Sequence, residues 1–445
     1  MPPALNQTLV VDNGAYTIKA GFAKQGAGPD SCSVIPNCIA RGRDRKVFVG
    51  TELDSCKDFG GMGFRRPVER GYLVNWESEK EIWDRAFLDT ASHLACDPRK
   101  TTLVLTEAPN APSTLQTNCD QIIFEEYEFG AYYRCIGASL VAWNDLGQDA
   151  GKPPTAPAEC AMVVDSGHSF THVIPVIRGK VYHPAVRRVD VGGKFLTNYF
   201  KEMVSIRHYN MIDETHVMNE IKEAVCFVST DFSADLEKCK RMKKGGNPIV
   251  MDYVLPDYNE GKAGYARAHA PRQGKLAMGP DEQHMTLGNE RFTVPELLFT
   301  PSDVGMKQAG IPEVVMQSLE KVPEQFRDLL LANVVIVGGN INIPGFLERF
   351  EMELRILAPA ETVVRVIKPD YPTKYTWQGG VNLALNQSAL TARAITRAEY
   401  LEHGSSWVAK KFAGLPIPAG AGSSGAGGER SSASASHKKR RVSDV

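Results

Sequence analysis

A motif of buried strand, aspartate and glycine turn occurs twice in this chain, within residues 9–22 and within residues 161–173. In each copy an apolar run rich in β-branched residues leads to an aspartate, Asp12 or Asp165, and a glycine follows two residues later. Glycine adopts positive φ angles without steric penalty, so each copy predicts a strand, a tight turn and a second strand. Two such turns, one early and one near the middle of the chain, predict two similar domains with a cleft between them.

Backbone N–H groups of both turns could hold a phosphate chain in that cleft. Asp12 and Asp165 would then lie near a Mg²⁺ ion and its waters, because hard cations prefer oxygen ligands and keep part of their hydration shell. The alternative is that both aspartates only cap their turns. A single Asp-x-Gly hairpin is more often a hydrophilic turn, whereas two copies behind apolar strands favour the cleft.

Length and composition indicate a soluble protein of more than one domain. A chain of 445 residues exceeds what one hydrophobic core supports, and 43% apolar with 23% charged residues is ordinary for a globular protein. The net charge of −1 argues against wholesale nucleic-acid binding. No apolar run approaches the roughly 20 residues that a bilayer requires, and residues 1–8 lack the features of a signal peptide. Nine scattered cysteines without a C-x-x-C pair predict free thiols in a reducing compartment.

Hydrophobic periodicity predicts alternating helices and strands between the two hairpins and beyond the second. Segments predicted to be strands are 47–49, 101–105 and 333–337, and segments predicted to be helical are 78–90, 113–126, 190–204, 214–227 and 313–330. Ser113 is expected to be the N-cap of its helix. Residues 130–143 fit either a strand or a helix, and the Pro- and Gly-rich segment 145–159 is the expected domain crossing.

Residues 238–280 have poor periodicity and are interpreted as an insertion. Its basic start, 238–244, is either a solvated charge run or a contact to DNA phosphate or an acidic partner. The apolar residues in 249–258 are too many for a solvated loop, which favours a docking surface for a partner; the competing interpretation is a short strand pair on its own lobe.

The C-terminal segment is dominated by Gly, Ser and Ala and ends in the basic cluster Lys438, Lys439, Arg440 and Arg441. Such a composition buries too little apolar surface to fold, so a disordered tail is expected. A basic cluster on a flexible arm is accessible to an import receptor, although it could also serve only solubility.

Motifs in residues 8–413 resemble those of the actin family. The matching segments are Asp12-Asn13-Gly14 with 19–23, Val164-Asp165-Ser166-Gly167 with Thr171-His172, and the segments 106–109, 287–292 and 377–380. The resemblance implies an α/β protein with the actin fold: two lobes, each with a mixed five-stranded sheet and helices, and ATP in the cleft. It implies a small lobe of 1–155 and 376–413, a large lobe of 156–375 with an insertion at about 238–280, and a disordered basic tail of 414–445.

Residue-by-residue matching to the family also implies a nucleotide site. Its expected members are Asp12, Asn13, Gly14, Lys19, Asp165, Ser166, Gly167, Gly193, Lys222, Glu223, Gly338, Gly339 and Asn340. Asp12 and Asp165 would hold a metal ion through water if Mg²⁺ is present. The resemblance allows ATP or ADP with Mg²⁺, or a nucleotide-free cleft.

Several departures from the actin pattern bear on hydrolysis. The serine and glycine that follow the first turn in actin are Ala15 and Tyr16 here, and the second turn carries His168 and Ser169 in place of an aspartate and a glycine. The glutamine that positions the attacking water in actin is replaced by Gly137. Because phosphoryl transfer to water needs a positioned nucleophile, we expect slow or absent hydrolysis and no catalytic residues.

Three further positions correspond to residues that, in actin, hold the water network or contact the adenosine. His172 matches the second residue of actin's water network. Asn342-Ile343 replaces the aromatic wall beside the base, and Lys374 is a candidate for the lysine beside the adenine.

The segment 40–64 differs most from actin, because a short 41–46 turn stands where actin carries a long loop that inserts into the next filament subunit. Loss of one repeated contact weakens a head-to-tail filament, so no homopolymer is expected. Among actin-related proteins, segments 63–67, 70–76 and 124–129 most resemble the sixth class.

That class implies a nuclear, non-catalytic structural subunit of the Swr-type chromatin remodeler, which exchanges a variant histone into nucleosomes. The partners that it implies are the remodeler's motor subunit, a zinc-finger HIT-type subunit and, through the complex, the nucleosome with its histones and DNA. No membrane partner is expected.

Two other functional classes remain open at this stage. A filament-forming actin-like ATPase is disfavoured by Gly137 and by the short 40–64 segment. A kinase of the sugar-kinase and heat-shock ATPase superfamily is disfavoured by the actin-like segments 106–109 and 287–292 and by the lack of an obvious base for a sugar hydroxyl.

Overall fold

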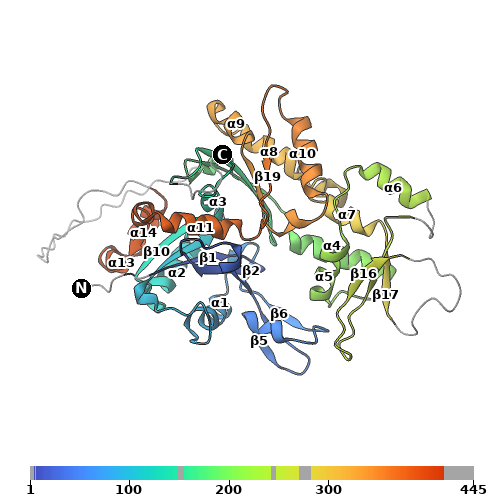
Figure 1. Cartoon of the computed structure of the whole chain (residues 1–445), viewed down its shortest axis with the longest axis horizontal. Coiled ribbons are helices and arrows are strands. Elements are labelled where there is room, and N and C mark those ends of the chain that lie inside the picture. The colour runs from blue at the N-terminus through green and yellow to red at the C-terminus, as the bar shows by residue number, and fades with distance from the viewer. Residues whose placement is uncertain (1–4, 6, 148–154, 242–246, 270–281, 415–445) are drawn as a thin grey trace, which may run out of the picture.

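Each of the two repeated hairpins lies inside its own mixed β-sheet, and the two sheets belong to different lobes (Figure 1). The computed structural model describes residues 5, 7–147, 155–241, 247–269 and 282–414. The chain begins in the lobe that holds the first hairpin, builds the second lobe, and returns to the first with its last helices (Figure 1). This is the two-lobed α/β architecture that the resemblance implies.

The sheet of the first lobe has the order β20-β10-β9-β1-β2-β3. Its strands are β1 (Gln7–Asn13), β2 (Thr17–Phe22), β3 (Ser33–Pro36), β9 (Thr101–Glu107), β10 (Ala131–Ile136) and β20 (Ile395–Thr396). The hairpin β1–β2 is antiparallel, whereas β9 runs parallel to both β1 and β10. The carboxyl ends of β1, β9 and β10 therefore meet at one edge of the sheet, beside the first turn.

The sheet of the second lobe repeats this arrangement in the order β13-β12-β11-β18-β19, with β14 also paired to β12. Its strands are β11 (Cys160–Ser166), β12 (Thr171–Ile177), β13 (Lys180–Val181), β14 (Arg187–Val189), β18 (Val334–Val337) and β19 (Val366–Ile367). The hairpin β11–β12 is antiparallel and β18 runs parallel to β11.

Both sheets contain six strands within the described residues, where five were expected. The difference lies in strands two or three residues long. β20 pairs with the start of β10, and β13 and β14 pair with different parts of β12. Strands this short carry no periodicity that a sequence pattern could detect.

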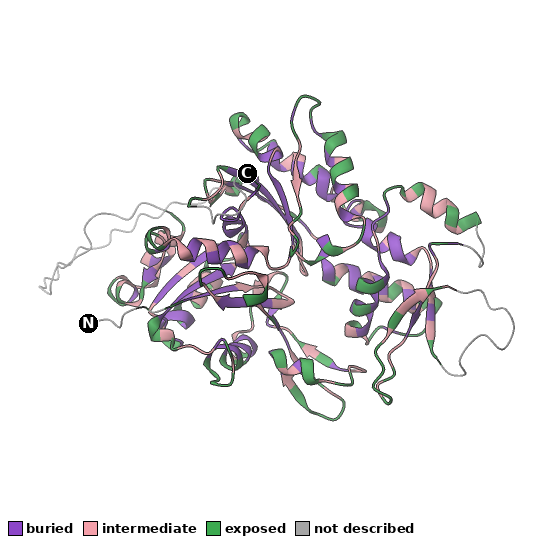
Figure 2. Ribbon diagram, viewed as in Figure 1, coloured by how far each residue is buried: buried purple, intermediate pink, exposed green. Residues whose placement is uncertain are grey.

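Helices cover the sheets on their outer faces and line the region between them (Figure 1). In the first lobe they are α1 (Trp76–Trp83), α2 (Ser113–Gln121), α3 (Gly137–Val141), α11 (Tyr375–Leu385), α12 (Gln387–Thr391), α13 (Arg397–His403) and α14 (Ser405–Phe412). In the second lobe they are α4 (Gly193–Arg207), α5 (Thr215–Val225), α6 (Phe232–Arg241), α7 (Glu290–Glu296), α8 (Ile311–Leu319), α9 (Glu324–Leu331) and α10 (Phe346–Leu357). Figure 2 shows buried residues concentrated in the sheet strands and in the helix faces that cover them.

Three local predictions are refined by the structure. The helix expected at 78–90 begins at Trp76, with the Asn75 side chain accepting a hydrogen bond from the Ser78 N–H at 3.1 Å. Ser113 is the first residue of α2 rather than its N-cap, which is Pro112 without a side-chain cap. Residues 130–143 form both a strand and a helix, β10 followed by α3.

Segment 247–269 belongs to the second lobe, and its interpretation as a docking surface is wrong. It forms β15 (Met251–Val254) and β16 (Tyr265–Ala268), which join β17 (His284–Leu287) in a three-stranded sheet. Tyr253 and Val254 are buried, so their own lobe covers the apolar surface that suggested a partner. Residues 242–246 and 270–281 of the proposed insertion lie outside the described residues.

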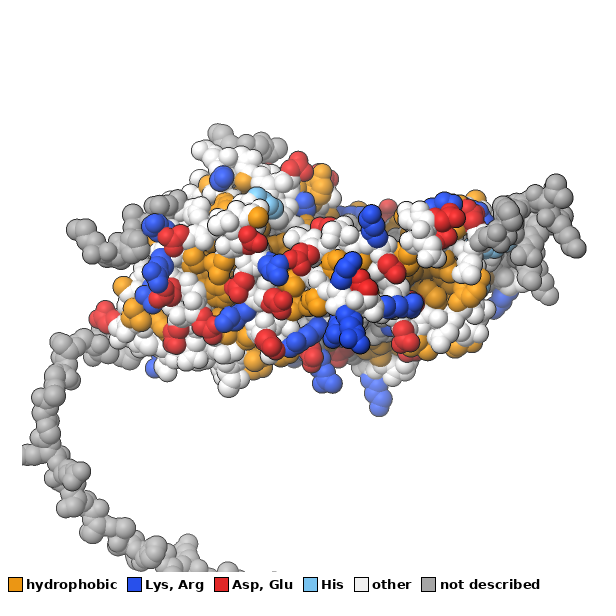
Figure 3. Space-filling view, turned by 90° about the horizontal axis from the view of Figure 1, so that it is seen from below, with side chains coloured by type: hydrophobic (Ala, Val, Ile, Leu, Met, Phe, Trp, Pro, Cys, Tyr) orange, Lys and Arg blue, Asp and Glu red, His pale blue; other side chains and the backbone are white. Residues whose placement is uncertain are grey.

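The basic start of that segment is partly neutralised within α6. Lys238 contacts Asp235 at 2.8 Å and Arg241 contacts Glu237 at 2.7 Å. This part of the cluster is a solvated helix face, which was the simpler of the two interpretations. On the face shown in Figure 3, basic and acidic side chains are likewise interspersed.

A small three-stranded sheet, β5-β4-β6, extends from the first lobe. It comprises β4 (Ile39–Arg41), β5 (Val47–Val49) and β6 (Gly63–Arg65), and a two-stranded ribbon of β7 (Val68–Glu69) and β8 (Tyr72–Leu73) follows. The β4–β5 connection is a tight turn, in which the Gly42 N–H donates to the Lys46 carbonyl at 2.9 Å. The short 41–46 segment therefore offers little chain with which to reach a neighbouring subunit.

The outer rim of the cleft is bridged by contacts between this extension and α5. The Phe59 ring stacks on His216 with centroids 4.3 Å apart. The Gly61 N–H donates to the carboxylate of Glu214 at 3.0 and 3.1 Å. The two lobes thus touch at the rim as well as through the chain crossings at their base.

All nine cysteines are free, as their spacing predicts. Within the part of the chain that the structure describes, no helix has the length and apolar character needed to cross a bilayer.

The C-terminal return to the first lobe depends on two adjacent glycines in α11. A Cβ atom on Gly379 would lie 1.9 Å from the Leu140 carbonyl oxygen, and one on Gly380 would lie 2.5 Å from a Val10 methyl. Only residues without a side chain let α11 pack this closely on α3 and β1. The actin-like segment 377–380 is thereby explained as a packing motif.

A buried ion-pair network joins β9, β10 and α2 in the first lobe. The Arg134 guanidinium donates to Asp120 at 2.9 and 3.2 Å and to Glu107 at 2.6 Å. Asp120 is fully buried and Arg134 is nearly so. Removing the cation would leave a carboxylate buried without compensation, which is among the more damaging changes that a protein core can undergo.

We predict that Arg134→Met lowers the free energy of unfolding by about 3–5 kcal/mol, measured by urea denaturation. The matched control is Arg99→Met, which breaks an exposed pair with Glu128 and should leave the denaturation midpoint nearly unchanged. Equal effects of the two substitutions would show that the buried network does not stabilise the first lobe.

Candidate nucleotide site

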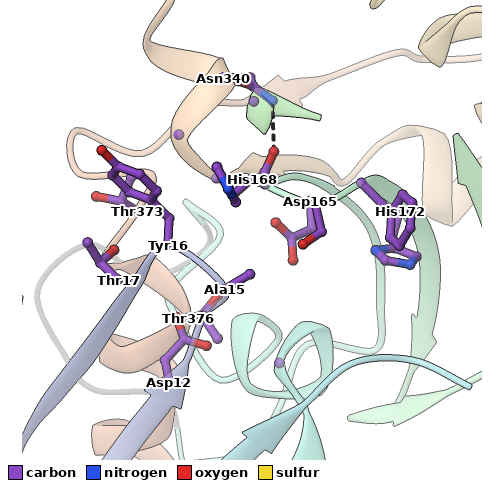
Figure 4. Close-up of a pocket in the computed structure, with 18 of the residues that line it drawn as sticks. Asp12, Ala15, Tyr16, Thr17, Asp165, His168, His172, Asn340, Thr373 and Thr376 are labelled. Atoms are coloured by element: carbon purple, nitrogen blue, oxygen red, sulfur yellow. Dashed lines mark hydrogen bonds between the residues drawn. The ribbon is translucent and has the colours of Figure 1, made fainter. Parts of the chain in front are cut away.

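A cavity of about 440 Å³ lies between the two hairpin turns (Figure 4). Its walls come from both turns, from the carboxyl end of β9, from the start of α3 and from residues 338–343 and 372–376. Of the site residues implied by the sequence, those that line this cavity are Asp12, Asn13, Gly14, Lys19, Asp165, Gly167, Gly193, Lys222, Glu223, Gly338, Gly339 and Asn340. The structure thus brings together residues from five separate parts of the chain.

The first turn is held by a hydrogen-bond relay from the neighbouring strand. The Thr106 hydroxyl donates to Asp12 Oδ1 at 2.8 Å and accepts from the Asn13 N–H at 3.0 Å. Gly14 is required at the turn because a Cβ atom there would lie 2.6 Å from the Thr17 carbonyl oxygen. The relay fixes the Asp12 carboxylate before any ligand arrives.

Both turns carry backbone N–H groups that are available to an anion. Within the described residues, no partner accepts from the N–H groups of Ala15, Tyr16, His168 or Ser169. The Lys19 ammonium also lines the cavity, where the Thr17 carbonyl at 3.3 Å is its one acceptor in the part of the chain that the structure describes. Two sets of free amides with a nearby cation form a cradle of the kind that binds phosphate.

The Asp165 carboxylate lines the cavity without a hydrogen-bond partner among the described residues. Burial, together with the negative charge of Asp12, raises the pKa of Asp165 to about 7. A partly buried carboxylate with no donor, placed beside a second carboxylate, suits a divalent cation that would neutralise both. The residues present therefore fit Mg²⁺ held through water by Asp12 and Asp165.

Ser166 does not reach the cavity, contrary to the sequence-based expectation. Its hydroxyl is fully buried, lies 2.9 Å from the Thr171 hydroxyl and accepts from Asn340 Nδ2 at 3.0 Å. Asn340 also donates to the Gly167 carbonyl at 3.0 Å, and it is drawn in Figure 4 above the second turn. Ser166 and Asn340 thus position the turn, and of the two only Asn340 lines the cavity.

Gly338 brings the end of β18 against the second turn. It has φ of +103°, and a Cβ atom there would lie 2.3 Å from the Ser166 carbonyl oxygen. Only glycine combines this backbone angle with so close an approach. The position of Gly338 and Gly339 at the cavity is therefore set by backbone packing against the second turn.

Lys222 and Glu223 both line the side of the cavity formed by α5, but the Lys222 ammonium is engaged by its own lobe. Lys222 Nζ donates to the Thr197 hydroxyl and to Asn219 Oδ1, each at 2.9 Å. Burial lowers the pKa of Lys222. Its ammonium ties α4 to α5, and Glu223 accepts from Asn219 Nδ2 at 2.7 Å.

Lys374 was a candidate for the lysine beside the base, and the structure contradicts this. Its ammonium donates to the Pro29 carbonyl at 2.9 Å, and the residue does not line the cavity. The neighbouring wall is formed instead by Pro372, Thr373 and Thr376. These residues carry no charge or aromatic ring, so sequence reasoning had no signal with which to find them.

The position expected to orient the attacking water has no side chain, and the space where a side chain would begin is tight. A Cβ atom on Gly137 would lie 3.1 Å from the Thr376 side-chain methyl, so that methyl limits the space in front of α3. His172 lines the cavity as expected, and burial together with the nearby Arg188 cation lowers its pKa to about 4. The neutral imidazole persists at physiological pH, but the residue that would work with it is missing.

Thr106 is the site residue that sequence reasoning failed to assign a role. The signal was available, because β9 was predicted to be a strand and Thr106 follows its apolar run. Parallel neighbours end at the same edge of a sheet, so a polar residue there belongs beside Asp12.

Asp165→Asn should stabilise the ligand-free protein at pH 8. The folded-state pKa of Asp165, about 7, lies above the unfolded value of ~3.9. The stability that the protonated Asp165 side chain contributes is therefore fully present below the unfolded pKa and is lost as pH rises through 7. We expect the variant to unfold roughly a few degrees above the parent at pH 8 and equally near pH 4.

Thermal unfolding between pH 4 and pH 8 without Mg²⁺ measures this difference. The exposed Asp54→Asn is the control for loss of one negative charge. A lower Tm for Asp165→Asn at pH 8 would mean that Asp165 has a stabilising partner in the folded state.

Comparison with known proteins agrees with this arrangement. The Actin family model matches residues 4–413. Actin-like protein arp6 of Aspergillus fumigatus is 50% identical, covering 92% of this chain and 95% of its own. Actin-related protein 6 of Neurospora crassa is 46% identical over 93% and 95%, and actin-related protein 6 of Drosophila melanogaster is 39% identical over 90% and 98% of the two chains. The chain therefore belongs to the actin family, in its sixth class of actin-related proteins.

Proposed function

We propose that this protein is a non-catalytic structural subunit of a nuclear, ATP-dependent chromatin-remodeling complex that exchanges a variant histone into nucleosomes. In this proposal the actin fold is a docking module that binds nucleotide and hydrolyses little or none. The observation that carries the non-catalytic part is Gly137, which has no side chain and faces the Thr376 methyl. The similarity to proteins named actin-related protein 6 supports membership of the sixth class, and the remodeler role is what we propose for that class.

The site supports binding better than it supports chemistry. Free amides on two turns, Lys19 and a pair of carboxylates suit a phosphate chain with Mg²⁺. Bound Mg²⁺ would supply charge neutralisation to the phosphates. Hydrolysis requires in addition a water oriented for in-line attack, and Gly137 offers no group with which to hold it.

The geometry of the β4–β5 turn supports a subunit role over a filament role. A filament needs the same head-to-tail contact between every pair of neighbours. The Gly42–Lys46 hydrogen bond closes this connection tightly, so no long element projects from it. We infer that the protein joins a heteromeric complex and does not form a homopolymer.

The proposed partners are the remodeler's motor subunit and a zinc-finger HIT-type subunit, with histones and DNA contacted through the assembled complex. The proposed location is the nucleus, and no membrane partner is proposed. Import would use Lys438, Lys439, Arg440 and Arg441, which lie outside the described residues.

We predict that the purified protein releases phosphate from Mg²⁺-ATP no faster than its Asp165→Ala variant, because both lack a side chain at position 137 with which to orient water. A continuous phosphate-release assay at micromolar protein measures this difference. Turnover close to that of actin, abolished by Asp165→Ala, would contradict the non-catalytic assignment.

The complex itself provides the test of the main proposal. A tagged chain recovered from nuclear extract should bring down a remodeler motor subunit and a zinc-finger HIT-type subunit in near-equal amounts, quantified by mass spectrometry. Tagged actin from the same extract is the comparison for contacts shared by the whole family. Recovery of the chain mainly as its own sedimentable filaments would overturn the proposal and favour a cytoskeletal ATPase.

A further inference from the structure

The two side chains that most distinguish the turns from those of actin meet across the cleft. Tyr16 follows the first turn and His168 lies in the second, and their ring centroids are 4.9 Å apart with an interplanar angle of 37°. Figure 4 shows the two residues on opposite turns. A contact between two aromatic rings closes the space that would otherwise separate the tips of the turns.

Tyr16 is held in this position by groups from both lobes. The Arg66 guanidinium lies 4.4 Å from the ring centroid, and its Nη1 donates to the Tyr16 carbonyl at 3.2 Å. From the second lobe, Asn219 Nδ2 donates to the Tyr16 hydroxyl at 3.4 Å. A ring with a cation on its face and a donor at its hydroxyl has little freedom to swing away.

The ring pair separates two cavities. The second cavity, of about 340 Å³, lies toward the outer rim and is lined by residues such as Phe64, Arg66 and His216. Tyr16, His168 and Asn219 line both cavities. These three residues therefore form the wall at which the inner cavity ends.

This wall stands at the turns themselves, where the phosphate cradle lies. The free amides belong to Ala15 and Tyr16 on one side and to His168 and Ser169 on the other. We infer that phosphates on the inner side of the wall would reach these amides and that a chain longer by one phosphate would have to displace the rings.

His168 offers no charge in compensation for such a displacement. Burial and the neighbouring cations Arg66, Lys222, Lys194 and Lys19 lower its pKa to about 3, so the imidazole is neutral at physiological pH. A neutral ring pair excludes volume without attracting a terminal phosphate.

We propose that the Tyr16–His168 wall makes the inner cavity selective for a nucleoside diphosphate over the corresponding triphosphate. This inference rests on the proposed nucleotide site and specifies its ligand class. In this proposal Tyr16 is a specificity-determining residue, because its ring limits the length of the phosphate chain that fits. Removal of the ring should therefore let a longer phosphate chain bind.

The test is isothermal titration of Mg²⁺-ADP and of Mg²⁺ with a non-hydrolysable ATP analogue. The parent protein should bind ADP at least about tenfold more tightly than the analogue. Tyr16→Gly should reduce that ratio to about threefold or less by improving analogue binding. Tyr16→Phe keeps the ring and should keep the preference, and Tyr209→Gly, which removes an exposed tyrosine outside both cavities, is the matched control.

His168→Ala provides a second route to the same result if Tyr16→Gly does not fold, since it removes the other ring. Equal binding of the two ligands by the parent protein, or an unchanged ratio in both opened variants, would reject the wall and leave the nucleotide site standing. Absence of binding by either ligand to parent and variants would reject the nucleotide site and the wall together.

Discussion

The antiparallel pairing of each aspartate-bearing strand with the strand after its turn determines where everything else in the cleft lies. In the first lobe Asp12 pairs with Lys19, and in the second Asp165 pairs with His172. Parallel neighbours then bring further strand ends to the same edge: β9 places Thr106 beside Asp12, and β18 leads to Gly338. One local motif, present in both lobes, therefore produces a cleft between two facing sheet edges, and carboxylates and free backbone amides line it.

In the proposed function, the same cleft keeps the parts that bind phosphate and loses a part that hydrolysis needs. Features that hold phosphate are mostly backbone and buried strand ends, which the fold itself maintains. Features that orient water are single side chains, and replacement by Gly137 removes one without disturbing the helix that follows. Asp165 is left as a partly buried carboxylate without a hydrogen-bond donor among the described residues, a state that a bound cation would relieve. We therefore propose that the site binds nucleotide and hydrolyses it little or not at all.

The sequence predicted most of this architecture because the decisive signals were local. Short apolar runs followed by glycine or polar residues predict both hairpins, the strand that ends at Thr106 and the glycine turn after β18. The failures have different causes. Side chains alternate along a strand, so when Asp165 lines the cavity the adjacent Ser166 points away, and motif matching ignored this alternation. Segment 247–269 pairs with β17, a distant partner that local periodicity cannot reveal. The Tyr16–His168 contact joins residues 152 positions apart, so it could be predicted only from the complete fold.

The central claim is that two turns, one from each lobe, act together as a single phosphate site. Hydrogen–deuterium exchange of the backbone amides tests this most directly, because it reports on each turn separately. With Mg²⁺-ADP present, the account predicts slower exchange at both Ala15–Tyr16 and His168–Ser169, at the same ligand concentration. Protection of one turn alone, or of neither at saturating ligand, would contradict it.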